Sequence, residues 1–218
     1  MKVTISEGNT KLGKVHNISL PPVLTCQKDV PCSKKCYALK AWKMYNAVRD
    51  CWNANLDAWK EDAMGYFEFI SNYCAEKHVE RFRWHVAGDI PSTAYYNGMV
   101  LVAMCNPQTQ FLAFTKNFDV IGLPRPENLK LVASMWPGLM AHLGLGKPEQ
   151  TAKLRELKSH AGIAWMDPGT RGASFDPWYA DMLDTEVHEE SIECTGQCDE
   201  CFLCWYLDPG SSVVFKQH

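Results

Sequence analysis

The stretch "RFRWHVAGDIPSTAYYNGMVLVAMCNPQTQFLAFTK", residues 81–116, predicts a strand, a helix and a second strand in direct succession. Residues 81–90 alternate between polar and apolar side chains and end at Gly-Asp, as a buried strand does before a loop. Residues 92–105 are typical of a helix whose first turn is capped by Ser92, and residues 110–116 form the second strand. This order of elements favours a parallel βαβ unit.

Further strands and helices are expected on both sides of this unit. We expect a short β element before Leu20 and a helical stretch from Tyr37 to about Tyr73, where residues recur every three or four positions as on one helix face. The other expected elements are strands at 128–138, 162–169 and 211–218 and a helix at 148–161. With 218 residues, the chain fits an α/β domain over residues 1–190 and a cysteine-rich segment over residues 191–218 packed on the same domain.

Composition narrows the class of protein. The formal charge of −3 and the isoelectric point near 6.2 lack the basic excess of most nucleic-acid-binding proteins. Lys34, Lys35, Lys40 and Lys43 form a local concentration of charge, which is either a solvated helix face or a basic patch. Neither a long apolar run nor an apolar signal region occurs, so we expect no membrane span and a cytoplasmic location. There, the ten cysteines favour metal binding or catalysis over disulfides.

Cys26, Cys32 and Cys36, called here the first cysteine group, are spaced C-x5-C-x3-C just before the first predicted helix. Three thiolates leave a structural zinc site one ligand short, whereas a [4Fe–4S] cluster tolerates one iron that is open to a ligand or substrate. The helix N-terminus, together with Lys34 and Lys35, would stabilise an anionic cluster. The alternative is three buried free thiols.

Cys194, Cys198, Cys201 and Cys204, the second cysteine group, are spaced C-x3-C-x2-C-x2-C. Four ligands complete either a zinc site or a cubane cluster, and one compact run resembles the ferredoxin pattern more than a zinc knuckle. We therefore expect a second iron–sulfur cluster, with zinc as the alternative. Three further cysteines are interpreted as small buried hydrophobes, although any of them could supply a fourth ligand to the first group: Cys51, Cys74 and Cys105.

Polar residues are also expected to meet where the parallel strands end, because ligands bind at that edge in α/β folds. Asp89 is placed to bind an amine or hydroxyl, and Lys116, next to Thr115, a carboxylate or phosphate. His85 is either a core histidine with a satisfied hydrogen bond or a side chain near a cluster. Arg49 either snorkels from its helix face or points at an anionic ligand.

Five motifs together resemble a known family: "SLPPVLTC", "CSKKCYA", "RWHVAGDIPSTAYY", "FLAFTK" and "CTGQCDECFLCW". In order and over most of the chain, they are similar to the bacteriophage gene product eighty-eight-like family. The cysteine segment before a helix and the strand ending "HVAGD" resemble, more distantly, the radical SAM superfamily. The spacing here is five and three residues, whereas that superfamily has three and two, and "AGD" replaces its Gly-Gly-Glu.

The resemblance implies a partial or full (β/α) barrel like radical SAM cores. It implies a [4Fe–4S] cluster on the first cysteine group, with S-adenosylmethionine at the open iron. Ala87, Gly88 and Asp89 would replace the strand end that contacts the ligand's amine, and the second group resembles an auxiliary cluster. A host electron donor would be a partner, and a phage protein would work in the host cytoplasm.

Three functions follow from these expectations. The first is an iron–sulfur protein that performs redox or radical chemistry at the first cysteine group, with no catalytic residue assigned. The second is a non-enzymatic electron carrier or a protein whose cluster holds the fold together. The third is a zinc-stapled nucleic-acid-binding protein that uses the four lysines, which the acidic balance disfavours.

Overall fold

Seven short strands form one sheet in which every paired neighbour is parallel, in the computed structural model that describes residues 2–9, 12–187 and 191–216. The order is β1-β2-β3-β4-β5-β7-β6. The strands are β1 (His16–Ile18), β2 (Arg81–Trp84), β3 (Gln110–Thr115), β4 (Leu129–Met135), β5 (Gly162–Asp167), β6 (Ile192–Glu193) and β7 (Ser212–Lys216). The predicted α/β class and the strand–helix–strand unit of residues 81–116 are confirmed.

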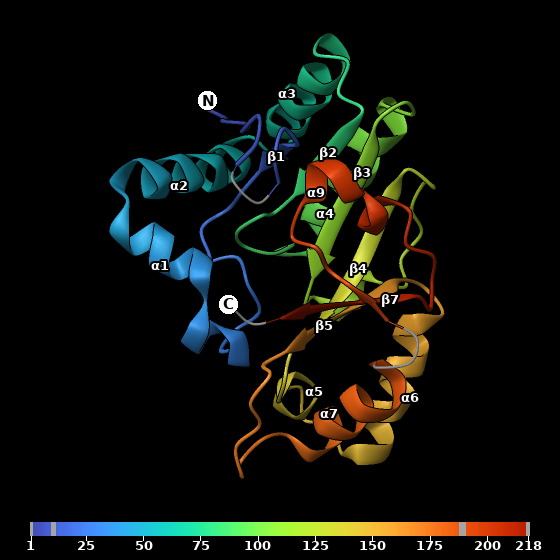
Figure 1. Ribbon diagram of the computed structural model, residues 1–218. Helices are drawn as coiled ribbons and strands as arrows, with labels where there is room; N and C mark the ends of the chain where they lie inside the picture. Colours follow the sequence, from blue (N-terminus) through green and yellow to red (C-terminus); the bar gives the residue numbers. More distant parts are fainter. Residues whose placement is uncertain (1, 10–11, 188–190, 217–218) are drawn as a thin grey trace.

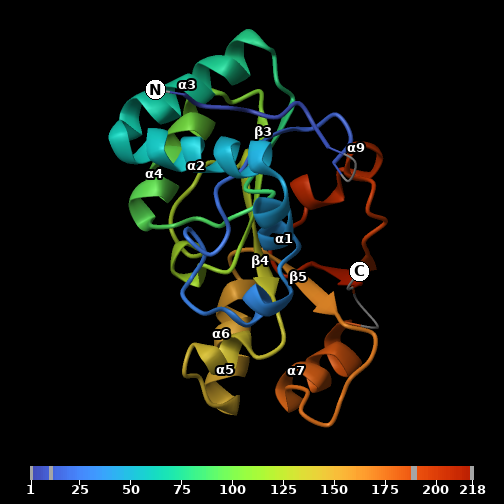
Figure 2. The same cartoon turned by 90° about the vertical axis from the view of Figure 1, so that its left-hand side faces the viewer.

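The helices are α1 (Tyr37–Met44), α2 (Asn46–Glu61), α3 (Ala63–Glu76), α4 (Thr93–Cys105), α5 (Leu139–His142), α6 (Lys147–Lys158), α7 (Pro177–Met182) and α9 (Cys198–Cys201). Short 3-10 and π turns complete the chain: η1 (Pro31–Lys35), η2 (Phe118–Val120), η3 (Leu183–Val187) and η4 (Leu203–Trp205). Helix α4 and the turn α9 lie on opposite faces of the sheet (Figures 1 and 2). Within the described residues, no helix is both long and apolar enough to cross a membrane.

Alternate side chains of the strands pack into two separate cores, one on each face of the sheet, because successive residues of a strand point to opposite faces. On the face towards α3 and α4, Phe82, Trp84 and Phe111 are fully buried in the larger core. The opposite face has a smaller core that includes Leu112 and Trp205. The segment after β6 therefore covers the face of the sheet that the helices leave free.

The C-terminal segment belongs to this same sheet. β7 lies between β5 and β6, so residues on both sides of the second cysteine group are sheet strands. The expected boundary at 190/191 adjoins residues 188–190, which lie outside the described residues, as do residues 217–218 of the predicted last strand. The order is linear, and no pairing joins β1 to β6 within the ranges that the structure describes.

The helical stretch expected from Tyr37 to about Tyr73 is confirmed, but it is not continuous. Tyr45 and Asp62 have extended backbones, and the region forms three helices, α1, α2 and α3. The carboxylate of Asp62 accepts a hydrogen bond of 2.9 Å from the Gly65 amide and so begins α3. The predicted cap of α4 is confirmed, since the Ser92 hydroxyl accepts a bond of 3.2 Å from the Tyr95 amide.

The contact between α3 and α4 depends on a glycine. A Cβ atom at Gly98 would lie 2.0 Å from the ring of Phe67. We expect Gly98→Ala to lower the free energy of unfolding by about 1–3 kcal/mol, because the ring has to shift within a filled core. Urea denaturation measures the effect. Adding Phe67→Leu to the Gly98→Ala variant should restore part of the lost free energy of unfolding.

Met104→Ala is the matched control, since this side chain of the same helix is 62% exposed. It should change stability by less than about 0.5 kcal/mol. Equal stability of Gly98→Ala and the wild type would contradict the close contact.

Candidate functional site

The loop that leads into the first cysteine group is fastened to the end of β2. The amide of Leu20 donates to the carbonyl of Ala87 at 3.0 Å, and the Ala87 amide donates to the Ser19 hydroxyl at 3.2 Å. Gly88 has a positive φ of 81°, and a Cβ there would lie 2.6 Å from the hydroxyl of Thr25. Gly88 therefore allows close packing of the cysteine loop against the strand end.

Asp89 joins the ends of β2 and β3. Its Oδ1 accepts hydrogen bonds from the Thr115 hydroxyl at 2.6 Å and the Ile90 amide at 2.7 Å. Its Oδ2 accepts from the Lys116 amide at 2.8 Å. Burial raises the pKa of Asp89, while the Lys116 charge and these hydrogen bonds oppose the increase. Of about four acceptor positions on a carboxylate, three are used, so little capacity remains for a ligand amine.

Lys116 extends the site from Asp89 towards the first cysteine group. Its ammonium donates to the Ser134 hydroxyl at 3.0 Å, which leaves two N–H groups for another acceptor. Burial raises the pKa of the Cys26 thiol to about 12 and also raises that of the Cys32 thiol. The positive charge of Lys116 opposes both increases. The expected residues Gly88, Asp89, Thr115 and Lys116 thus gather at the strand ends, next to Thr25, and the charges of Asp89 and Lys116 act on these two cysteines.

Cys36 has a separate structural role at the start of α1. Its sulfur accepts a hydrogen bond of 3.3 Å from the amide of Leu39, and so it caps the helix. The next residue, Tyr37, has a ring that is 65% exposed, while its hydroxyl points inwards and donates to the Val86 carbonyl at 2.6 Å. The first cysteine group therefore connects the helix terminus to the strand end.

The second cysteine group lies over the smaller core. Cys194, Cys198 and Cys204 pack against its buried residues, whereas Cys201 is exposed. Burial raises the pKa of Cys204 to about 12 and also raises that of Cys198, so both thiols are protonated at neutral pH without a metal. Buried, protonated thiols are poor nucleophiles, which disfavours cysteine covalent catalysis.

Two expected residues lie apart from the strand ends. Arg49 contacts its own helix, where it donates to Asn46 at 2.8 Å and lies 3.9 Å from Asp50. His85 is only 3% exposed, in contact with the rings of Trp84 and Tyr95. Neither of its ring nitrogens has a hydrogen-bond partner, so the expectation of a satisfied core histidine is wrong. Burial lowers the pKa of His85 to about 3.

Sequence reasoning missed Arg83, which faces the second cysteine group from β2. Its charge acts on Tyr37, Cys194, Cys198 and Cys204. The alternation in "RFRW" could have shown that Arg81 and Arg83 share the face opposite Trp84. It could not show that a segment more than a hundred residues later covers that face.

Sulfur is the right donor for iron–sulfur clusters or zinc, and both cysteine groups have enough thiols in one region to hold such a metal. In the part of the chain that the structure describes, no three His, Cys, Asp or Glu side chains form a ready ligand set for a metal ion. Metal binding would therefore draw the cysteine side chains of each group together.

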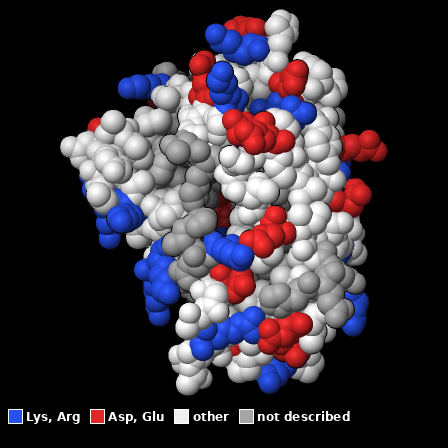
Figure 3. Space-filling view, viewed as in Figure 1, with Lys and Arg blue, Asp and Glu red and all other residues white. Residues whose placement is uncertain are grey.

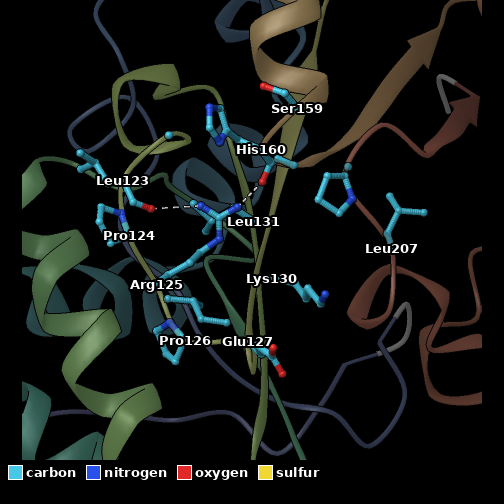
Figure 4. Close-up of a pocket in the computed structure, with 15 residues that line it drawn as sticks. Leu123, Pro124, Arg125, Pro126, Glu127, Lys130, Leu131, Ser159, His160 and Leu207 are labelled. Carbon is cyan, nitrogen blue, oxygen red and sulfur yellow. Dashed lines mark hydrogen bonds between the residues drawn. The ribbon is translucent and has the colours of Figure 1, made fainter.

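A surface cavity of about 340 Å³ lies at the other edge of the sheet, where β4 and β5 begin. Figure 4 shows Arg125 between Leu123 and His160 in this cavity. Arg125 donates to the Ile121 carbonyl at 2.7 Å and also to the carbonyl of His160. The arginine is thus occupied with backbone acceptors, and none of the expected site residues lines the cavity.

The role of Asp89 can be tested by substitution. Asp89→Ala should lower the free energy of unfolding by roughly 3 kcal/mol or more, because three donors, two of them buried, would lose their acceptor. Asp89→Asn should fall between Ala and the wild type in urea denaturation. The exposed Asp119 next to the site is the control, and Asp119→Ala should have little effect. A stable Asp89→Ala would show that Asp89 does not hold the strand ends.

Comparison with known proteins identifies the family. A family model described as Gene product 88 matches residues 3–206. Comparison with curated proteins gave no match, and comparison with solved structures gave none. The matched range includes both cysteine groups and the strand ends around Asp89 and Lys116. The family that the sequence motifs predicted is confirmed, and this chain belongs to the Gene product 88 family.

Proposed function

We propose that this protein is an iron–sulfur redox protein in which the first cysteine group binds a [4Fe–4S] cluster. The observation that carries the proposal is the position of this group. Cys26 and Cys32 lie beside the Lys116 ammonium at the carboxyl edge of a parallel sheet, and Cys36 caps a helix. A cationic side chain and a helix N-terminus both stabilise a centre made of thiolates. A [4Fe–4S] cluster supplies one-electron redox chemistry when bound.

The second cysteine group is proposed to bind a second cluster. Three of its thiols are partly buried against the smaller core, and the charge of Arg83 acts on them. Zinc is the alternative at this group because four thiolates suit either metal. A partial barrel like the radical SAM core is the matching fold proposal, supported by strands β1 to β5 lying in chain order.

Metal content tests this function directly. The chain purified without oxygen should contain about four or eight irons with matching sulfide. Replacing Cys26, Cys32 and Cys36 by Ser should remove one cluster, and replacing the second group by Ser should remove the other. Cys105→Ser is the matched control, since this exposed thiol belongs to neither group. Zinc without iron would contradict the iron–sulfur proposal.

A second candidate function is binding of an amino-acid-like ligand, such as S-adenosylmethionine, at the open iron of the first cluster. The observation that favours it is Lys116, which has N–H groups left over for a carboxylate and lies beside Cys26 and Cys32. Asp89 supports the ligand less directly, since its oxygens hold the strand ends. Such a ligand would give the protein radical chemistry, with a host electron donor as partner.

Electron paramagnetic resonance after dithionite reduction distinguishes the two candidates. A signal that changes on addition of S-adenosylmethionine is expected for the enzyme, and Lys116→Ala should weaken that change while keeping the iron. Lys130→Ala is the control, because Lys130 lies at the opposite end of the neighbouring strand β4. An unchanged signal would leave the electron carrier as the function.

Nucleic-acid binding has less support. Lys34, Lys35, Lys40 and Lys43 are exposed around η1 and α1, as a solvated face would be. On the face seen in Figure 3, basic and acidic side chains are interspersed over the described residues. A nucleic-acid-binding surface more often concentrates positive charge in one stripe.

A further inference from the structure

Residues 23–45, called here the basic segment, run from the loop before the first cysteine group to the residue that follows α1. The segment contains five lysines and one acidic residue, Asp29, in a chain whose formal charge is −3. All five lysines are exposed, and none forms an ion pair with another described residue: Lys28, Lys34, Lys35, Lys40 and Lys43. Because the rest of the chain is acidic, the field of the protein would turn this segment towards an anionic surface.

Lysines alone would form an ordinary solvated face, but exposed apolar side chains lie among them. Of the twelve large apolar side chains that are exposed in the described residues, five belong to the basic segment: Val23, Leu24, Tyr37, Met44 and Tyr45. Tyr37, Lys40 and Met44 are three and four positions apart, so they share one face of α1. That face is therefore both basic and apolar.

Two hydrogen bonds place the loop and the helix of the basic segment next to each other. The Tyr37 hydroxyl donates to the Val86 carbonyl at 2.6 Å, and the Asp89 amide donates to the Thr25 hydroxyl at 3.3 Å. Val86 and Asp89 belong to the same short loop after β2. The start of α1 and the loop before Cys26 thus adjoin one turn of the chain, and Figure 1 shows both to the left of the sheet.

The backbone at Val23 is held in an unusual conformation. Its φ is 70°, in the left-handed region that β-branched residues rarely adopt. Such strain persists only where the surroundings fix it, and here the Thr25 hydroxyl donates to the Pro21 carbonyl at 3.0 Å across the turn. The strained turn leaves Val23 and Leu24 exposed to water. A costly conformation that presents two apolar side chains favours a role in binding.

We propose that the basic segment binds the surface of an anionic membrane. The lysines contact the negatively charged lipid headgroups, while the apolar side chains enter the boundary between headgroups and acyl chains. Each contribution alone is weak, and together they attach the protein peripherally. The inference goes beyond the proposed redox function and does not depend on metal binding.

The apolar side chains decide between a membrane and other anionic partners. A nucleic-acid backbone is bound through charge, to which aliphatic side chains such as Leu24 and Met44 add little. A protein partner would bind most tightly to a central cluster of anchor residues. Here the apolar side chains are spread over a loop and a helix, and Tyr37 and Met44 alone are roughly 10 Å apart along α1. A bilayer interface accepts this spread because it has no fixed shape.

Vesicle binding tests the proposal. The chain, kept reduced, should co-sediment with vesicles of phosphatidylcholine and phosphatidylserine mixed at about two to one, and not with vesicles of phosphatidylcholine alone. Added salt should release it, because salt screens the attraction between exposed charges. Binding to neither kind of vesicle would overturn the proposal, and equal binding to both would contradict the role of the lysines.

A matched pair of double variants tests the apolar contribution. Leu24→Ser with Met44→Ser should weaken binding to the anionic vesicles roughly tenfold. The control is Leu101→Ser with Met104→Ser, which changes the same residue types at 60% and 62% exposure in α4, a helix without charged residues. It should bind as the wild type does. An equal loss in both double variants would show that the basic segment is not the binding surface.

A second pair tests the charge. Lys40→Gln with Lys43→Gln should weaken vesicle binding roughly tenfold or more. Lys77→Gln with Lys147→Gln makes the same change in net charge at exposed positions outside the segment and should have little effect. Equal losses would mean that net charge alone matters. Urea denaturation should show that all four double variants fold like the wild type, because every substituted side chain is exposed.

Other occupants of this surface give different results. Binding of a single-stranded oligonucleotide or of polyglutamate through Lys40 and Lys43, without vesicle binding, would replace the membrane by that class of partner. Self-association that is lost in Leu24→Ser with Met44→Ser, again without vesicle binding, would assign the surface to a second copy of the chain. Iron content is measured separately, so the proposed redox function can fail while membrane binding stands, and the reverse.

Discussion

Asp89 connects three parts of the chain that are distant in sequence, through its carboxylate and its backbone amide. It accepts hydrogen bonds from the hydroxyl and amide that end β3, while its own amide donates to Thr25 in the loop before Cys26. A buried carboxylate is tolerated only when such donors surround it. The geometry of the candidate site therefore depends on Asp89, whose carboxylate holds the end of β3 and whose backbone amide holds the loop before Cys26.

Local patterns in the sequence predicted the elements that local chemistry determines. The structure confirms the cap at Ser92 and a strand that begins at Arg81, but this strand ends at Trp84, and residues 85–90 of the expected strand form a loop. The stretch after Tyr37 is helical as expected, but its breaks were not predicted, because the hydrophobic periodicity continues across Tyr45, where the backbone is extended. Periodicity reports which residues face the core, and it does not report where one helix stops and the next begins.

The relation between the two cysteine groups could not be predicted from the sequence. Their spacings describe each group alone, whereas their positions depend on the insertion of β7 between β5 and β6. That pairing brings the second group over the face of β2 and β3 and beside Arg83. Long-range strand order has no local signal, so the residue that lies between the two groups was missed as well.

The position of β7 also has a consequence for biosynthesis. β6 precedes the second cysteine group and β7 follows it, yet β6 pairs with the sheet through β7. During translation, the four cysteines therefore leave the ribosome before the strand that fastens them against the sheet. Until β7 pairs with β5, the segment that carries these cysteines has no strand to hold it against the sheet. The smaller core beneath it is therefore completed only after residues 212–216 have been made.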